Sequence, residues 1–183
     1  MDVGYIQESV GPFPTALGAA FNTFTTKKSV DALPVPVILS GKLRAGSKLA
    51  IKSSGEYSAT ATPNVTVGYW LGTRALAITL DLALSPVIVA PNATAWQWDM
   101  WWDGICVPGA SAGLHNLVGM GGLRLGASLT TFNAEVPIHT TAALRTVAID
   151  VTIERAIGVS WTWSASAAGN NVQVYTHNVT IQN

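Results

Sequence analysis

The segment from Ala95 to Asp103 carries the side chains best suited to chemistry in this chain. It reads AWQWDMWWD, so Asp99 and Asp103 flank Trp101 at a spacing of two residues on each side. Every second residue of a β-strand points to the same face, which predicts that these three side chains lie together. Carboxylates beside aromatic rings are typical of glycosidases and sugar-binding modules. Positions four residues apart in a strand are about 13 Å from each other, which is wide for an acid–base pair. Asp99, Trp101 and Asp103 are therefore a candidate ligand surface, with a sugar stacked on Trp101.

Other reactive residue types are present, but their spacing matches no catalytic or metal-binding pattern. The three histidines, His115, His139 and His177, are far apart in sequence, and with Cys106 they could bind zinc only if the fold gathered them. We interpret them as isolated residues, and the lone cysteine as a buried small side chain. There is no Gly-x-Ser-x-Gly nucleophile motif. The sequence therefore predicts no enzyme activity and no metal or cofactor.

Composition favours a protein that associates with other proteins. The chain has 183 residues, which suggests one domain. Charged residues make up 11% and the net charge is zero, against about 25% charged residues in an average soluble domain. Near-zero net charge promotes association, and no basic excess is present to attract nucleic acid or an anionic membrane. The most apolar window, Ala75 to Ala90, contains Asp81 and Pro86 and is shorter than the roughly 20 residues of a membrane span. No signal peptide is predicted at the N-terminus.

From Val35 onward the hydrophobic pattern is that of β-strands. Roughly ten short alternating segments are separated by turn residues, with no long helical period, which is typical of an antiparallel sandwich or jelly roll. We therefore predict an all-β fold with a single domain over residues 35–183. The alternation assigns Trp96, Trp98, Met100 and Trp102 to the core. Residues 107–122 are rich in glycine and are predicted to form a long loop.

The C-terminal stretch, Val159 to Gln182, predicts a closing β-hairpin. Val159, Trp161 and Trp163 alternate with polar residues, and Gly169-Asn170-Asn171 suits a turn. The apolar phase slips by one residue near His177, which indicates a bulge or a change of partner strand. The opposite face of the hairpin is polar and uncharged, and it is a candidate interface between subunits, formed by Ser160, Thr162, Ser164 and Asn171.

Residues 1–34 differ from the rest, with two prolines, many small residues and no sustained period. One interpretation is an extended N-terminal arm that contacts a capsid or a neighbouring subunit, because isolated apolar residues on an arm usually order against a partner surface. The apolar residues that would make this contact are Tyr5, Ile6, Phe13, Leu17, Phe21 and Phe24. The alternative is a first strand with loops belonging to the same domain.

Two stretches resemble segments of small jelly-roll structural proteins from tailed bacteriophages. Residues 43–58, LRAGSKLAIKSSGEYS, are similar to one segment of those proteins, and Pro63-Asn64-Val65-Thr66-Val67 with Leu71-Gly72 is similar to the element that follows it there. Thr140-Thr141 and residues 161–172, WTWSASAAGNNV, are similar to their closing element. The resemblance extends over about residues 35–183. It implies a trimerising jelly-roll head of the kind found in head decoration proteins, head fibres and tail-tip proteins.

The resemblance and the composition together lead to two hypotheses. The first is a homotrimeric capsid decoration protein that binds the major capsid protein or another virion protein, on the exterior of a capsid assembled in the host cytoplasm. The absence of a shaft-like repeat favours decoration over a fibre. The second is a receptor- or glycan-binding module of a head fibre or tail tip, which would use Asp99, Trp101 and Asp103.

Overall fold

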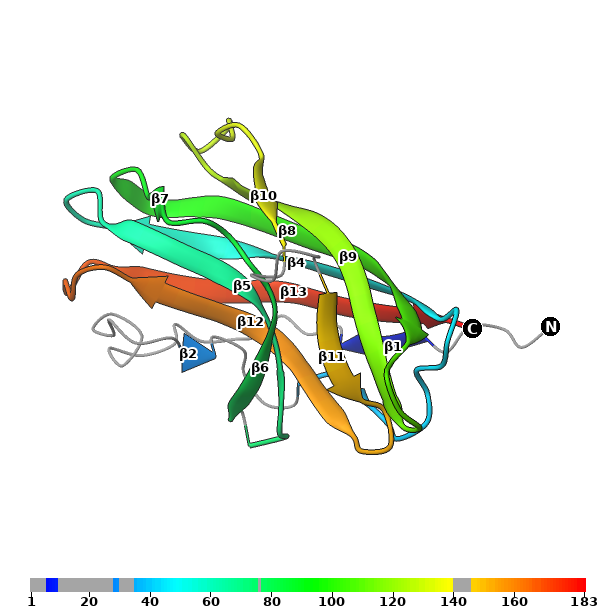
Figure 1. Cartoon of the computed structure of the whole chain (residues 1–183). Helices are drawn as coiled ribbons and strands as arrows, with labels where there is room; N and C mark the ends of the chain where they lie inside the picture. The colour runs from blue at the N-terminus through cyan, green and yellow to red at the C-terminus, as the bar shows by residue number, and fades with distance from the viewer. Residues whose placement is uncertain (1–5, 10–27, 30–34, 76, 140–145) are drawn as a thin grey trace.

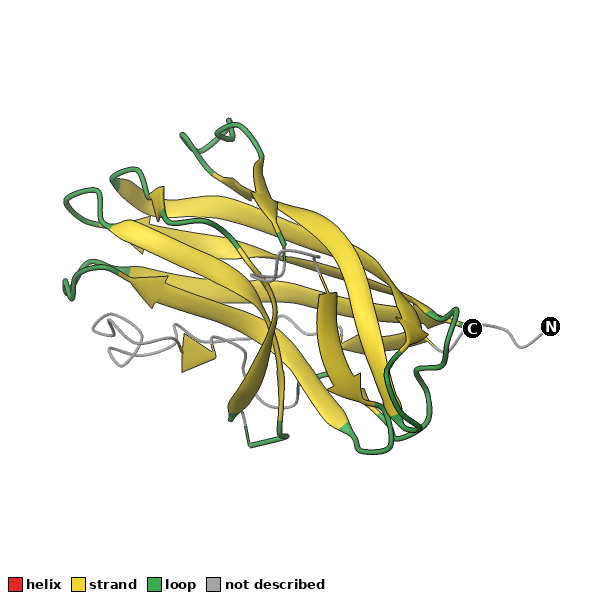
Figure 2. Ribbon diagram, in the orientation of Figure 1, coloured by secondary structure: helices red, strands yellow, loops and turns green. Residues whose placement is uncertain are grey.

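The protein is a β-sandwich of two antiparallel sheets (Figures 1 and 2). The computed structural model describes residues 6–9, 28–29, 35–75, 77–139 and 146–183. Within these ranges the secondary structure consists of strands, turns and loops, and no helix is long and apolar enough to cross a membrane. The predicted all-β antiparallel sandwich is confirmed, and the finer prediction of a jelly roll stays a prediction.

The larger sheet, sheet A, has seven described strands, and its long strands form a continuous surface. Its order is β1-β13-β4-β8-β9-β10, and β11 also pairs with β9. The bounds are β1 (Ile6–Ser9), β4 (Lys48–Ala59), β8 (Ala93–Pro108), β9 (Leu114–Leu125), β10 (Val136–Ile138), β11 (Thr146–Asp150) and β13 (Asn171–Gln182).

The smaller sheet, sheet B, has six described strands and covers one face of sheet A (Figure 1). Its order is β2-β12-β5-β6, with β3 also on β12 and β7 also on β5. The bounds are β2 (Lys28–Ser29), β3 (Val37–Ile38), β5 (Asn64–Gly72), β6 (Ile78–Leu84), β7 (Ile88–Val89) and β12 (Arg155–Trp163).

Tryptophans from both sheets form the centre of the core. Trp98 and Trp102 of β8 are at most 1% exposed, and Trp161 and Trp163 of β12 are fully buried. The ring of Trp161 lies 5.8 Å from that of Trp98 and 5.3 Å from that of Trp163, in tilted arrangements that aromatic pairs favour. The prediction that these alternating tryptophans face inward is confirmed.

The predicted closing hairpin is wrong. β12 pairs with β5 in sheet B, whereas β13 pairs with β4 in sheet A. The chain therefore crosses between the sheets at residues 164–170. Alternation identifies the apolar face of each strand, but it does not distinguish two hydrogen-bonded neighbours from two strands that face each other across a core. The predicted phase slip is confirmed as a register shift between Val174 and Thr176.

The predicted loop at residues 107–122 is also wrong. β8 continues to Pro108, and β9 begins at Leu114, so most of this segment is strand. Its glycines have a packing role. An added Cβ at Gly119 would lie 2.4 Å from the Trp102 ring, and one at Gly121 would lie 1.9 Å from the Trp101 carbonyl oxygen. The glycines here allow strands of one sheet to approach each other closely, whereas a glycine-rich sequence by itself predicts a loop.

Two pieces of the N-terminal segment are described, and both pair with strands of the same chain. Ile6–Ser9 lies antiparallel to residues 177–180 of β13, and Lys28–Ser29 pairs with Ser160 and Trp161 of β12. These pairings agree with the alternative in which the segment contributes strands to its own domain. The remaining residues proposed for the arm contact, Tyr5, Phe13, Leu17, Phe21 and Phe24, lie outside the described residues, so the predicted contact with a capsid or neighbour stays a prediction.

Candidate functional site on the outer face of sheet A

The face of sheet A that points away from sheet B carries a continuous set of polar side chains. Because β8 alternates, its core residues leave Asp99, Trp101 and Asp103 on the outer face. The register places Ser54 of β4 beside Asp99, Lys52 beside Trp101, and Ala50 beside Asp103. On the far side of β4, Thr176, Asn178 and Thr180 of β13 are opposite these same three β4 residues. We call this region the Trp101 face. It is defined by Lys52, Ser54, Asp99, Trp101, Asp103, Arg124, Thr176 and Asn178.

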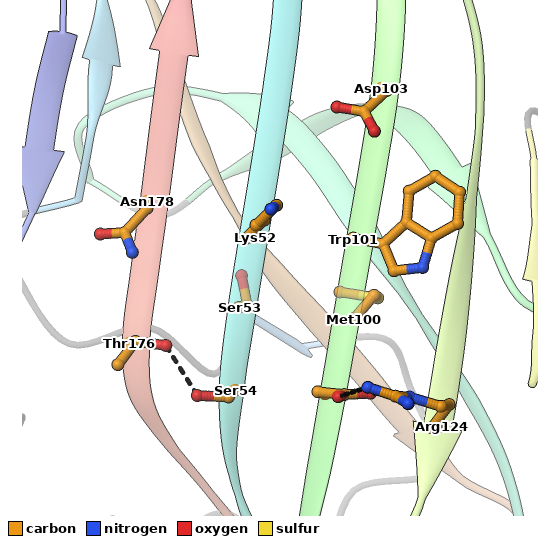
Figure 3. Close-up of a pocket in the computed structure, with 10 residues that line it drawn as sticks. Lys52, Ser53, Ser54, Met100, Trp101, Asp103, Arg124, Thr176 and Asn178 are labelled. Carbon is orange, nitrogen blue, oxygen red and sulfur yellow. Dashed lines mark hydrogen bonds and ion pairs between the residues drawn. The ribbon is translucent and has the colours of Figure 1, made fainter.

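Trp101 is half-buried, in contrast to the buried tryptophans of the core. Its side chain extends from β8 towards β9, away from Lys52 (Figure 3). Its register partner on β9 is Gly122, which has no side chain, and the carboxyl group of Glu135 occupies the space next to that glycine. Trp101 thus contributes an aromatic surface that is open to solvent in part and bordered by carboxylates.

Asp99 is held by Arg124 and is not a free carboxylate. Arg124 Nε donates to Asp99 Oδ1 at 2.8 Å, and a second hydrogen bond joins Nη2 to Oδ2. The hydrogen bond with Asp99 is the main cause that raises the pKa of Arg124. The guanidinium also lies 5.1 Å from the centre of the Phe132 ring. This two-point ion pair fixes one end of the Trp101 face and leaves Asp103 as its exposed acceptor.

A shallow cavity of about 580 Å³ lies on this face. It is lined by side chains of four strands, including Lys52 of β4, Trp101 and Asp103 of β8, Arg124 of β9 and Asn178 of β13. Within the described residues, Lys52 and Asp103 take part in no ion pair, so their charged groups are available to a ligand. A concave site with an aromatic surface and a few placed polar groups is the usual form of a small-molecule or saccharide site.

A second cavity of about 290 Å³ adjoins the first along the strands. Asp103 lines both cavities, and the second is also lined by Lys48, Ala50, Thr180 and Gln182. The small side chain of Ala50 lies between Asp103 and Thr180 in the register. The two cavities therefore lie end to end along β4, with β13 side chains on one side and β8 side chains on the other, and we call them together the groove along β4.

A serine–histidine pair lies beneath the Trp101 face but has the features of a core contact. Ser53 Oγ is 2.7 Å from His177 Nδ1, and the two residues are 3% and 0% exposed. His177 Nε2 donates to the carbonyl oxygen of Ile157 at 3.2 Å, where a catalytic triad has a carboxylate. Burial lowers the pKa of His177 from 6.5 to about 4, so the ring is neutral near pH 7. The pair links sheet A to Ile157 of sheet B.

The candidate subunit-interface residues are in different environments. Ser160 is 1% exposed within the chain, where its hydroxyl donates to the Gly68 carbonyl, so it does not form part of the outer surface. Thr162 is half-buried. Ser164 is exposed and accepts a hydrogen bond from the Asn64 amide, and Asn171 is half-buried. Thr162, Ser164 and Asn171 remain candidates for a contact between subunits.

Of the residues considered as metal ligands, Cys106 is buried, as expected for a small core side chain, and burial raises the pKa of its thiol. In the described ranges, no three histidine, cysteine or acidic side chains are close enough to hold a metal ion.

Sequence inspection identified the β8 part of the Trp101 face but missed the rest. Lys52 was recognisable as an outward residue, since it alternates with Leu49 and Ile51. Arg124 and Asn178 gave no signal, because only the strand register brings them to Trp101. A scan of protein-family models, a search of curated proteins and a search of solved structures each find no match to this chain.

Proposed function

We propose that the chain is a structural virion protein, a homotrimeric decoration protein that binds the outer shell of a phage capsid. The observation that supports this proposal most is where the two stretches that carry the resemblance lie. The first stretch covers most of β4 and β5. Residues 161–172 of the second stretch cover the end of β12, the connection and the start of β13, and Thr140-Thr141 lies outside the described residues. β4 pairs with β13, and β5 pairs with β12, so the two stretches form adjoining parts of the sandwich. They therefore behave as one structural unit, as a resemblance in fold requires.

Low charge supports the same proposal. No Asp, Glu, Lys or Arg occurs from Ala156 to the C-terminus, although this segment includes the exposed residues Ser164 and Gln182. A protein that binds only the assembled shell stabilises it by mass action, to an extent set by its affinity and concentration. An uncharged surface lowers the desolvation cost of such an interface.

The experiment compares the full chain with a variant that lacks residues 1–34. Light scattering should give a mass three times the chain mass of 19.2 kDa for the full chain. Co-sedimentation with empty capsids of the encoding phage should show binding by the full chain that the truncated variant has lost. A sample of the truncated variant without capsids corrects for the larger species expected when the β13 edge is exposed. A truncated variant that decorates capsids fully would show that residues 1–34 are not the contact, and a monomeric full chain that binds no capsid would contradict the proposal as a whole.

A second candidate function, recognition of a receptor or glycan at a head fibre or tail tip, is favoured by the Trp101 face. The cavity there brings Trp101 together with Lys52, Asp103 and Asn178 from three strands. Trp101→Ala removes the aromatic surface from a position that is not in the core, so it should weaken glycan binding by about tenfold or more while the fold remains intact. Unchanged glycan affinity in the folded variant would exclude this site.

A further inference from the structure

We infer that the groove along β4 binds a neutral, extended oligosaccharide, with Trp101 as the stacking residue. This inference rests on the second candidate function and names its ligand class. Four outward residues of β4 line the groove along its length, from Ser54 at one end to Lys48 at the other. These two residues are six positions apart, which corresponds to about 20 Å along a strand. That length is several times the width of one sugar ring, so the groove is suited to a chain of sugars.

The side chains on the two walls differ in the contacts that they offer to a sugar. The β13 wall consists of Thr176, Asn178, Thr180 and Gln182, whose hydroxyl and amide groups both donate and accept hydrogen bonds. Sugar hydroxyls have the same dual character. The indole of Trp101 lies on the β9 side of β8 (Figure 3), still within the lining of the first cavity, where it offers an apolar face to the C–H groups of a sugar ring. Asp103, at the junction of the two cavities, accepts hydrogen bonds from hydroxyls of adjacent sugars.

The charge balance favours a neutral ligand. In and beside the groove, the positive groups Lys48, Lys52 and Arg124 are matched by the negative groups Asp99, Asp103 and Glu135. An anionic glycan would be attracted by the lysines and repelled by Asp103, which lies beside Ala50 between them in the register. The geometry therefore gives no net electrostatic attraction for an acidic chain, whereas hydroxyl groups can bond to either kind of charge.

The test uses the full chain and defined oligosaccharides. The probes are neutral hexasaccharides of glucose, mannose and N-acetylglucosamine, and an acidic hexasaccharide of galacturonate, measured by calorimetry and saturation-transfer NMR. At least one neutral hexasaccharide should bind, and at least tenfold more tightly than its monosaccharide, because the groove contacts several rings. Trp101→Ala should weaken this binding by about tenfold or more. Val89→Ala, on β7 of sheet B, removes an exposed apolar side chain elsewhere and should leave binding unchanged.

Three results would overturn the inference, and they separate it from the function on which it rests. Binding of the acidic hexasaccharide alone would disprove the neutral class but leave glycan recognition standing. Binding of no oligosaccharide by the folded chain would contradict both this inference and the second candidate function. A change in oligomeric mass in Trp101→Ala, measured by light scattering, would show that the Trp101 face lies between copies of the chain, and would also remove both.

Discussion

At the scale of single residues, the two sheets are joined by a buried polar network. His177 of sheet A donates from Nε2 to the carbonyl of Ile157 in sheet B, which leaves Nδ1 as the acceptor for the Ser53 hydroxyl. The hydroxyl of Tyr69, also in sheet B, donates to the Met100 carbonyl in sheet A at 2.9 Å. Hydrogen bonds in a core are weakened little by solvent and impose geometry. This network therefore fixes how the sheets sit on each other beneath the Trp101 face.

The network predicts a pH-dependent stability that can be assigned to His177. Burial lowers its pKa from 6.5 in the unfolded chain to about 4 in the fold. As the pH falls through this window, the unfolded chain binds a proton before the folded chain does, so stability that is complete above pH 6.5 is progressively lost towards pH 4. The loss should reach about 3 kcal/mol, measured as the free energy of unfolding by urea at a series of pH values.

The variant His177→Gln separates this effect from the titration of carboxylates. Glutamine retains a donor and an acceptor but does not titrate between pH 4 and 7. The variant should be less stable than the wild type near pH 7, and its stability should change less over the window. If both proteins lose the same free energy between pH 6.5 and pH 4, His177 is not the titrating group.

At the scale of elements, the fold is built from two strand pairs that cross between the sheets. One is β4 and β5, joined near Thr60, and the other is β12 and β13, joined at residues 164–170. Their turns are hydrogen-bonded to each other. The Thr60 amide donates to Asn170 Oδ1 at 3.0 Å, and the amides of Asn64 and Ser164 bond to the other turn at 2.9 and 2.8 Å. These bonds hold the first turn, in which Ala61 and Thr62 adopt the strained positive φ values of 61° and 49°.

Asn170 should therefore contribute far more to stability than its neighbour Asn171. Asn170 is fully buried, and its amide also donates to the Ala165 carbonyl at 3.1 Å. Asn170→Ala leaves a backbone donor and a backbone acceptor unpaired and should cost about 2 kcal/mol or more. The Oδ1 of Asn171 has no partner among the described residues, so Asn171→Ala should cost less than about 1 kcal/mol. Thermal and urea unfolding of both variants would measure the difference, and equal losses would contradict it.

The same turns show what could be predicted from the sequence. Alternation identified the strands and their buried faces, because burial of Trp161 and Trp163 depends only on local period. It placed β12 and β13 in one hairpin, because the pairing partner of a strand is set by distant residues. The candidate site shows the same division. Asp99, Trp101 and Asp103 share one strand and were found together, whereas Lys52, Arg124 and Asn178 became neighbours only through the register of four strands.

At the scale of the whole molecule, association depends on how the edges of the sheets are closed. β1 covers four residues of β13 at one edge of sheet A, and β2 covers two residues of β12 at an edge of sheet B. An uncovered strand edge presents unpaired amide and carbonyl groups, which readily pair with another chain. The N-terminal segment thus has a role inside its own chain, beside the contact proposed for it with a capsid or neighbour.

Removing β1 should therefore change the state of association. A chain that begins at residue 10 exposes the backbone of residues 177–180, whereas a chain that begins at residue 6 retains β1 and serves as the matched control. The longer deletion should produce species larger than the full chain in light scattering, and amide hydrogen exchange at residues 177–180 should become faster in any molecules that remain unassociated. The control should match the full chain in both measurements. If both deletions behave alike, β1 does not protect the β13 edge, and the proposed contact between subunits is then expected at another surface, for which Thr162, Ser164 and Asn171 are the next candidates.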